Sequence, residues 1–273
     1  MQQQLFVLGN GFDLNLGLPT SYSDFFDTSQ FKSRSSGLYN HFKKSLILSD
    51  TNWIDVENEL LIYGNMIDDV EVLKNEYDSF VEDFYKFIED VDYNRYMKHF
   101  TKSHARKFAR IMCDCENPLI FSFNFTMTLP LLRSVDRLSS DFNVIYVHGC
   151  IESENIVLGI SDAAKINHPQ KLFLKKAANP NYPSGNRFIN SLALSNVKGV
   201  HIYGLSLGES DHTYFKEHFA NLVKSTDPDV RTYVYYYGAK GRLDLLHQID
   251  ILSNNQLSRL FDSKKLVMID NKA

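Results

Sequence analysis

The feature that most constrains this chain is a short apolar run near the N-terminus that ends in a glycine turn. Residues 5–8 read Leu-Phe-Val-Leu, which is typical of a buried β-strand, and Gly9-Asn10-Gly11-Phe12-Asp13 follows directly. Glycines let the backbone turn sharply, and such a turn before a helix is a common phosphate site. Leu14 replaces the third glycine of the dinucleotide fingerprint. A plain turn with Asp13 as helix cap is therefore the alternative.

Strand and helix patterns alternate along the rest of the chain. Further apolar runs typical of strands lie at 118–123, 143–149, 198–204, 230–238 and 265–269. Helical patterns lie between them, at 129–138, 214–223 and about 240–250. This alternation predicts an α/β protein with an open, mostly parallel, Rossmann-like sheet and helices on both faces.

A helical region separates the first two predicted strands. Apolar residues recur there at steps of three and four, which indicates an amphipathic helix: Tyr77, Phe80, Val81, Phe84, Phe87, Ile88 and Val91. We expect a short capped helix at 19–26, a loop or mobile lid at 27–40, and a second long helix at 94–112. The sequence thus predicts a single domain, 1–273, with a helical insertion at about 30–112. The polar segment 161–190 is expected to form loops and one helix that contacts a ligand or partner.

Composition excludes several classes of function. The chain has 273 residues and a net charge of −4, with both signs scattered, so nucleic-acid binding is not favoured. It has no recognisable signal peptide and no apolar stretch long enough to span a membrane, so we expect a cytoplasmic protein. The spacing of Cys113, Cys115 and Cys150 does not match a zinc or redox motif, so we expect reduced thiols and no metal site.

Four of the predicted strands end in a polar residue beside a small or turn-forming one. These ends are Gly9-Asn10-Gly11-Phe12-Asp13, Asn124-Phe125-Thr126, His148-Gly149 and Gly204-Leu205-Ser206. In an open parallel sheet, ligands bind beyond the carboxyl ends of the strands. We therefore expect the four ends to converge on one crevice.

These motifs, with several others, resemble the AbiH family of bacterial phage abortive-infection proteins. The matching elements are Gly9 to Asp13 with Gly17-Leu18-Pro19-Thr20-Ser21-Tyr22, Trp53-Ile54-Asp55-Val56-Glu57, Phe123-Asn124-Phe125-Thr126, Val147-His148-Gly149, and Gly204-Leu205-Ser206-Leu207 with Asp211. They run from residue 6 to about 215. Phe125 stands where the family has Tyr, and Leu205 where it has His. No hydroxyl or imidazole is therefore carried over at these two positions.

The order of the motifs is also similar to the wider sirtuin-like group. That resemblance implies that Gly9, Gly11, Gly17 and Pro19 lie at the pyrophosphate of NAD, and that Asn124 and His148 lie at the nicotinamide ribose. The zinc module of sirtuins has no counterpart here, which disfavours lysine deacylation. The resemblance implies binding or cleavage of NAD or a related dinucleotide as substrate or ligand, with no tightly bound cofactor.

The residues suit cleavage of the bond between nicotinamide and ribose, which passes through a cation-like sugar. We expect Asn124 to position a water and His148 to accept a proton, because the ordinary pKa of histidine, about 6.5, is near neutrality. Asp13 or Glu57 would stabilise the positive charge. Backbone N–H groups of residues 9–12 would hold the phosphates. The predicted catalytic residues are Asn124, His148 and Asp13; the predicted ligand-binding residues are Gly9, Asn10, Gly11, Phe12, Gly17, Pro19, Glu57, Thr126, Gly204, Ser206 and Asp211.

Structural roles compete with these assignments. His148 could be a core histidine, and Asn124, Asp13, Ser206 and Asp211 could cap turns or helices. We expect His201, His212 and His218 to be structural or to lie at the surface.

Three functions follow from this sequence. The first is an antiviral enzyme that cleaves NAD when a phage-derived trigger is sensed. The second is a binding module that senses a nucleotide and acts through a partner, and the third is a toxin nuclease that uses the same pocket. Defence enzymes of the type that the resemblance implies often assemble, which is compatible with a homo-oligomer. Turnover of NAD by the purified protein separates the first from the second.

Overall fold

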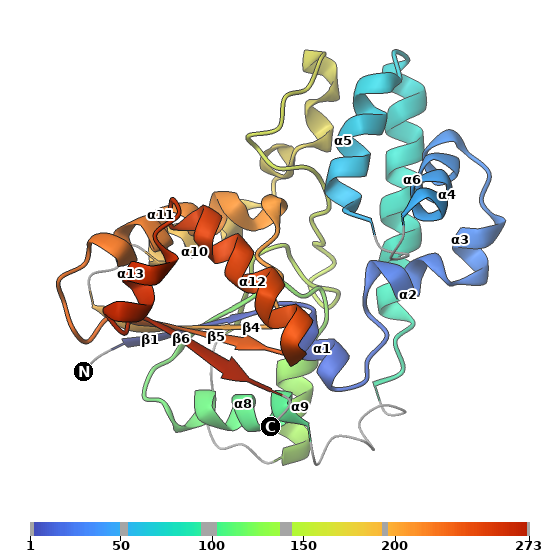
Figure 1. Ribbon diagram of the computed structural model, residues 1–273. Helices are drawn as coiled ribbons and strands as arrows, with labels where there is room; N and C mark the ends of the chain where they lie inside the picture. The colour runs from blue at the N-terminus through green and yellow to red at the C-terminus, as the bar shows by residue number, and fades with distance from the viewer. Residues whose placement is uncertain (1–2, 50–53, 94–102, 137–143, 193–195, 272–273) are drawn as a thin grey trace.

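The computed structural model describes residues 3–49, 54–93, 103–136, 144–192 and 196–271, and its centre is a six-stranded sheet (Figure 1). The strands lie in the order β3-β2-β1-β4-β5-β6, and all neighbouring pairs are parallel. The predicted open α/β sheet is confirmed. The strand bounds are β1 Gln3–Leu8, β2 Leu119–Ser122, β3 Val144–Tyr146, β4 Val197–Tyr203, β5 Arg231–Tyr236 and β6 Leu266–Asp270.

The strand order reverses at β1. Leu8, the last residue of β1, pairs with Ser122 of β2 on one side and with Tyr203 of β4 on the other. The chain builds the sheet first toward β3 and then, from β4 on, in the opposite direction. Such a switch point opens a crevice at the carboxyl ends of the strands. The glycine turn after β1 lies at this point.

Helices cover both faces of the sheet, as predicted (Figure 1). One face carries α10 (Pro183–Leu192), α11 (His212–Lys224), α12 (Gly238–Leu252) and α13 (Leu257–Asp262); the other carries α8 (His104–Asp114) and α9 (Thr128–Asp136). Leu5 and Val7 of β1 belong to the apolar cluster on the first face, while Phe6 and Leu8 belong to the cluster with α8. Both faces of β1 are therefore buried, which explains its continuous apolar run.

Beside the sheet stands a helical lobe, which we define as α2 to α6 (Figure 1). Its helices are α2 (Tyr22–Phe26), α3 (Ser29–Ser33), α4 (Gly37–Leu48), α5 (Val56–Met66) and α6 (Val70–Glu89). The predicted loop at 27–40 is wrong, because α3 lies within it and α4 begins in it. Thr28 caps α3 by accepting from the N–H of Phe31, and the buried side chains of Phe31 and Tyr39 anchor the two helices.

The long amphipathic helix is confirmed as α6. Its side chains Tyr77, Phe80, Phe84 and Ile88 are buried in the apolar cluster of the helical lobe. The predicted second helix falls partly on residues 94–102, outside the described part of the chain. Its described part is α8, which packs with Phe6 under the sheet.

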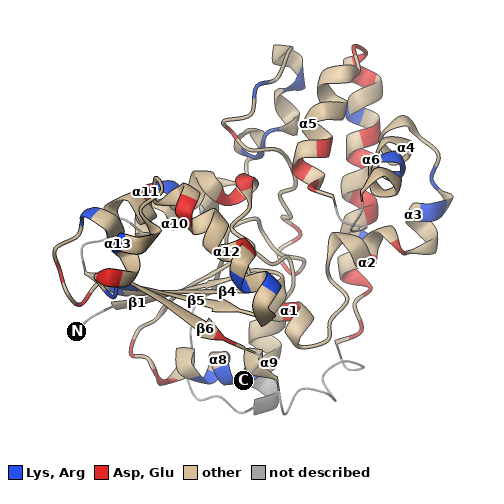
Figure 2. Ribbon diagram, in the orientation of Figure 1, with Lys and Arg blue, Asp and Glu red and all other residues tan. Residues whose placement is uncertain are grey.

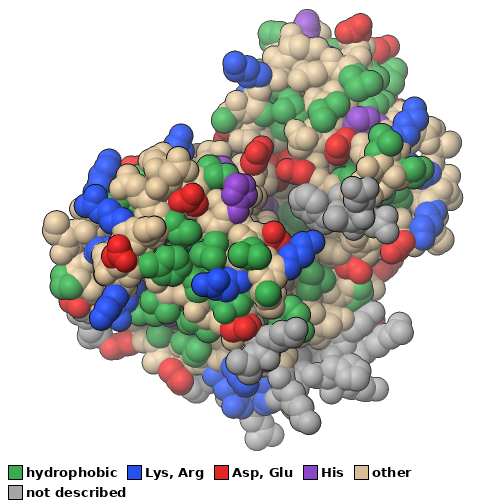
Figure 3. Space-filling model, viewed as in Figure 1, with side chains coloured by type: hydrophobic (Ala, Val, Ile, Leu, Met, Phe, Trp, Pro, Cys, Tyr) green, Lys and Arg blue, Asp and Glu red, His purple; other side chains and the backbone are tan. Residues whose placement is uncertain are grey.

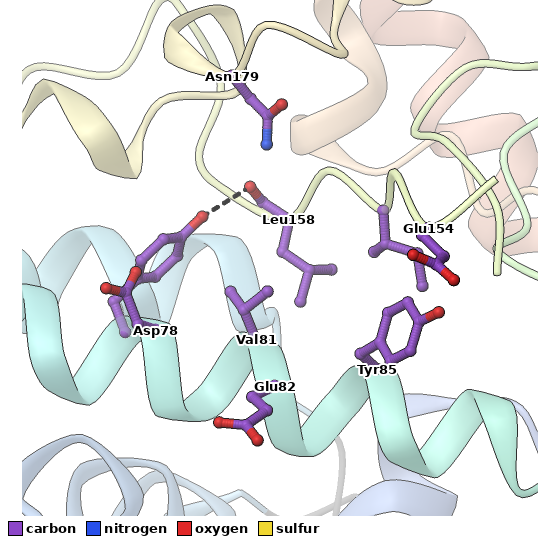
Figure 4. A pocket seen from close by; sticks show the side chains of 9 residues that line it. Asp78, Val81, Glu82, Tyr85, Glu154, Leu158 and Asn179 are labelled. Carbon is purple, nitrogen blue, oxygen red and sulfur yellow. Dashed lines mark hydrogen bonds between the residues drawn. The ribbon is translucent and has the colours of Figure 1, made fainter.

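The segment between β3 and α10 joins the helical lobe to the sheet. It contains the 3₁₀ helices η2 (Pro169–Leu174) and η3 (Lys176–Ala178). The hydroxyl of Tyr77 on α6 donates to the carbonyl of Leu158 at 2.9 Å (Figure 4). Ile156, Leu158 and Leu174 add to the apolar cluster of the lobe. The lobe is thus held against the sheet by backbone that leads directly out of β3.

The surface carries no large block of one charge in the view of Figure 3, where Lys, Arg, Asp and Glu are interspersed. Acidic side chains recur along α5 and α6 (Figure 2). None of the helices in the described part of the chain is long and apolar enough to cross a membrane.

Candidate functional site

The glycine turn after β1 is bound to the turn after β4. The N–H of Gly9 donates to the carbonyl of Tyr203, and the N–H of Gly11 to that of Gly204, both at 2.8 Å. The N–H of Phe12 donates to the carbonyl of Gly9 at 2.9 Å. These three N–H groups are therefore occupied by protein carbonyls. For Gly9, Gly11 and Phe12 this corrects the expectation that their backbone N–H groups hold a phosphate.

Close backbone packing explains the glycines of these two turns. A Cβ on Gly11 would lie 2.7 Å from Cα of Gly204, and a Cβ on Gly204 would lie 2.5 Å from N of Phe12. Gly204 also has φ of +75°, a conformation that residues with a Cβ rarely adopt. The glycines let the two turns at the switch point touch backbone to backbone.

Gly17 ends the short helix α1 (Gly11–Asn15). Its φ is +83°, its N–H donates to the carbonyl of Leu14, and the N–H of Leu18 donates to that of Asp13. This is the Schellman arrangement, in which glycine stops a helix. Gly17 is therefore explained by its role in ending α1, without a role in ligand binding.

A small cavity, here called the inner cavity, lies between the carboxyl ends of the strands and the helical lobe. Its volume is about 170 Å³. It brings together seven predicted site residues from distant parts of the sequence: Asn10, Asp13, Glu57, Asn124, Thr126, His148 and Asp211. Residues that were not predicted as site residues complete its wall, five of them from the quoted motifs and two from α6: Thr20, Tyr22, Phe123, Phe125, Leu205, Phe84 and Ile88. The predicted convergence of the strand ends is present.

Three polar atoms of this wall have no hydrogen-bond partner among the described residues. They are Oδ1 of Asn124, Nδ1 of His148 and Oε2 of Glu57, and all three are buried. Buried polar side-chain atoms in native proteins nearly always have a partner. Three such atoms around one cavity indicate that a ligand or ordered water completes them.

His148 is held in a cage of aromatic rings beyond the end of β3. Its ring lies parallel to that of Tyr182, with 6.4 Å between centroids, and edge-on to Phe123 at 5.3 Å. Burial, together with the charge of Lys176, lowers the pKa of His148 well below 6.5. The imidazole is therefore neutral at pH 7. This corrects the expectation that its pKa lies near neutrality, which took no account of burial.

Asp13 is fully buried and fixes the loop after β2. It accepts hydrogen bonds from the hydroxyls of Thr126 at 2.5 Å and Thr128 at 2.7 Å. Burial raises the pKa of Asp13 to about 6, although these hydrogen bonds lower it in part. Burial likewise raises the pKa of Asp211, in η4 (Glu209–Asp211), to about 7. The inner cavity thus holds two carboxyl groups that change charge close to neutrality.

Asp13→Asn should flatten the pH dependence of stability. Burial raises the pKa of Asp13 from 3.8 to about 6, so the native state binds this proton more tightly than the unfolded chain. Stability therefore falls as the pH rises through this window. Between about pH 4 and 7, the titration of Asp13 should lower the free energy of unfolding of the wild type by about 3 kcal/mol. Asp13→Asn should lack this decrease, because asparagine does not titrate. Urea unfolding at each pH measures this difference, with Asp78→Asn, at an exposed position of α6, as control. Equal pH slopes in wild type and Asp13→Asn would refute the assignment.

Glu57 enters the inner cavity from the first turn of α5, which is capped by Asp55. Its Oε1 accepts from Nζ of Lys176 at 2.5 Å. Trp53 of the same motif lies outside the described residues. Lys176 was not predictable as a site residue, because no motif surrounds this lysine in its polar segment.

A larger open groove, here called the outer groove, adjoins the inner cavity and shares Asn10 and Leu205 with it. Its volume is about 850 Å³. It includes the predicted residues Asn10, Gly11, Gly204 and Ser206. Four tyrosines also line it: Tyr203, Tyr235, Tyr236 and Tyr237. Their sequence pattern predicts only strands. For Tyr235 to Tyr237, the signal that points to a surface role is the aromatic run that continues past the end of β5.

Four predicted ligand-binding residues line neither the inner cavity nor the outer groove. They are Gly9, Phe12, Gly17 and Pro19. Phe12 is fully buried, with its ring 5.7 Å from that of Tyr203. These residues shape the turn that carries Asn10 and Asp13.

A separate pocket of about 350 Å³ lies between α6 and residues 154–158 (Figure 4). It contains none of the predicted site residues. Two of its carboxylates are paired on α6, Asp78 with Lys74 and Glu82 with Lys86. Among the residues that the structure describes, no group of three or more His, Cys, Asp or Glu side chains is arranged to hold a metal ion.

Comparison with known proteins gives one finding. A family model described as "Bacteriophage abortive infection AbiH" matches residues 5–236, which is most of the chain and includes every residue of the inner cavity. No curated protein and no solved structure matches.

Proposed function

We propose that this chain, which belongs to the bacteriophage abortive infection AbiH family, cleaves the nicotinamide–ribose bond of NAD or a related dinucleotide during infection. The observation that carries the proposal is the lining of the inner cavity, which combines three buried polar atoms that have no protein partner with the carboxyl groups of Asp13 and Asp211, whose pKa values burial raises. Perturbed carboxyl groups in a cleft are typical of acid–base sites.

The polar atoms suit a sugar. Oδ1 of Asn124 and Oε2 of Glu57 are hydrogen-bond acceptors, and the hydroxyls of a ribose are donors. The adjoining outer groove would take the rest of the dinucleotide, with its tyrosines against the second base. Among the described residues that line the two spaces there is no Lys or Arg. The diphosphate would therefore be held by hydroxyl and amide groups, from Asn10, Ser21, Ser23 and Ser206.

The reaction in this proposal is a hydrolysis. The bond between C1′ of the ribose and N1 of the nicotinamide ring breaks, and its electron pair leaves with neutral nicotinamide. Water adds to C1′ and gives its proton to a carboxylate. Asp211 is the best matched base, because its pKa of about 7 is close to the operating pH. The neutral His148 orients the water or a ribose hydroxyl, and the carboxylates stabilise the cation-like sugar.

His148→Ala should abolish both NAD cleavage by the purified protein and toxicity in infected cells, because it removes an orienting group from the cavity. Positioned groups of this kind contribute about 10²–10⁴-fold to rate. Release of nicotinamide, followed by chromatography, measures the rate, and circular dichroism checks the fold. His247→Ala, on α12 and outside both spaces, is the matched control.

The outcomes separate the candidate functions. Retained toxicity in His148→Ala would refute the role of His148. Wild-type protein that binds NAD but releases no nicotinamide under any trigger would refute cleavage and leave the nucleotide sensor as the function. Cleavage of nucleic acid instead of NAD would establish the toxin nuclease.

A further inference from the structure

We propose that Lys176 is a positioning residue of the inner cavity, which holds Glu57 so that one of its carboxylate oxygens faces the ligand. In this arrangement Glu57, rather than Asp13, is the carboxylate that stabilises positive charge on the substrate. The inference rests on the proposed function and adds a residue to it from a segment that no motif covers.

The ion pair fixes one oxygen of Glu57 and leaves the other without a protein partner. Nζ of Lys176 lies 2.5 Å from Oε1 of Glu57, and the two side chains are 4% and 24% exposed. Oε2 is buried and has no partner in the described part of the protein. A carboxylate held at one oxygen cannot rotate freely, so Oε2 keeps one direction, and Glu57 lines the inner cavity.

The backbone that carries Lys176 is tied to the backbone of His148. The N–H of Lys176 donates to the carbonyl of Ile160 at 3.1 Å, and Ile160 N–H donates to Leu174 at 2.8 Å. The N–H of Val157 donates to the carbonyl of His148 at 2.7 Å. Leu174 of the same segment is buried in the apolar cluster of the helical lobe, to which Glu57 also belongs through α5. The segment is thus held both by the loop after β3 and by the lobe, and these contacts fix the place of Lys176 beside Glu57.

Asp13 is less suited to face a cation. Its Oδ1 and Oδ2 both accept hydrogen bonds from threonine hydroxyls, and the side chain is fully buried. Hydrogen bonds that already satisfy both oxygens reduce the charge available to a ligand. Glu57 has one oxygen with no such bond.

Lys176 is also the cation that offsets the acidic surroundings of Glu57. Burial raises the pKa of Glu57, and Lys176 opposes that rise. The titratable and charged groups that interact with Glu57 are Lys176, Asp55, Tyr22, Tyr182, Asp211 and Tyr214. Lys176 is the one cation among these described groups. Without its charge, Glu57 should take up a proton at a higher pH.

Lys176→Gln tests the inference, because glutamine keeps a donor for Glu57 but removes the charge. We expect kcat for NAD cleavage at pH 7 to fall about a hundredfold with little change in KM, as for misplaced catalytic groups. The acid limb of the pH profile should move to higher pH, because Lys176 lowers the pKa of Glu57 and that of Asp211. Lys176→Arg, which keeps the charge, should restore most of kcat and the position of that limb. An ion pair that only stabilises the fold would lower the melting temperature and leave kcat unchanged on the pH plateau, where Asp211 is ionised.

A second readout does not need turnover. The titration of the Glu57 carboxyl can be followed by ¹³C NMR, with Glu57→Gln to assign the resonance. We expect its midpoint to rise in Lys176→Gln and to stay near the wild-type value in Lys176→Arg. An unchanged midpoint in Lys176→Gln would overturn the inference. Absence of NAD cleavage by the wild type would instead refute the proposed function, while the titration would still decide the role of Lys176.

Discussion

Asn124→Asp should lower the rate of NAD cleavage by about 10²–10³-fold, the usual cost of losing one positioned polar group. The amide of Asn124 interacts with Asp13 and lowers the pKa of that carboxyl, while its Oδ1 is buried without a partner beside the cavity. A carboxylate at this position would lose the N–H donors and repel Asp13. The substitution hardly changes the shape of the side chain, so it isolates the chemistry of the amide.

The rate is measured as nicotinamide released at pH 7 by equal amounts of folded protein. Asn75→Asp, on the exposed face of α6, adds the same charge away from the cavity and should leave the rate unchanged. Melting temperatures of both variants identify any loss of fold. A wild-type rate in Asn124→Asp, at an unchanged melting temperature, would remove Asn124 from the site.

Gly204→Ala should destabilise the protein by about 2–4 kcal/mol. The new Cβ would lie 2.5 Å from the backbone nitrogen of Phe12, and φ at this residue is +75°. The contact is with backbone, so no side chain can rotate to relieve it, and the left-handed conformation adds strain of about 1–3 kcal/mol. Urea unfolding at pH 7 measures the loss.

Gly241→Ala on α12 is the matched control, because a Cβ there meets nothing within 4 Å. Alanine should stabilise this helix by roughly 0.5–1 kcal/mol. The comparison tests whether the glycines serve packing or ligand binding. Wild-type stability in Gly204→Ala together with weaker NAD binding would show that the glycine is required by the ligand and not by the contact with Phe12.

The sheet was predictable because each of its strands is marked by a local pattern of apolar residues in the sequence. The run of residues 5–8 and the alternation of strands and helices fix the parallel α/β class without any long-range information. The helices α3 and α4 were not predictable in the same way. Their serines indicated a loop, whereas in the structure Thr28 caps α3 and Phe31 and Tyr39 are buried in a cluster that only the folded lobe provides.

The site was predictable where a motif marks the end of a strand. Asn124 and His148 follow β2 and β3, and the parallel sheet brings them to one edge. The role of the glycine turn was not predictable, because the carbonyls that occupy its N–H groups belong to Tyr203 and Gly204, far along the sequence. Lys176 was missed for a related reason, since its partner Glu57 lies in another part of the fold.

The shifted pKa values also depend on tertiary structure. His148 has an ordinary pKa near neutrality in a peptide, and only the aromatic cage and Lys176 lower it. The pKa of Asp211 is shifted in the opposite direction, upward, because burial disfavours the charged carboxylate. The proton acceptor of the proposed reaction therefore changes from His148 to Asp211 once the structure is considered.

A crystal structure of the protein with a non-hydrolysable NAD analogue would locate the ligand site. We expect density for the nicotinamide ribose in the inner cavity, with its hydroxyls in hydrogen-bond contact with Oδ1 of Asn124 and Oε2 of Glu57. We expect the second nucleoside along the tyrosines of the outer groove. Density for the analogue elsewhere, with none in the inner cavity, would refute NAD cleavage at this site.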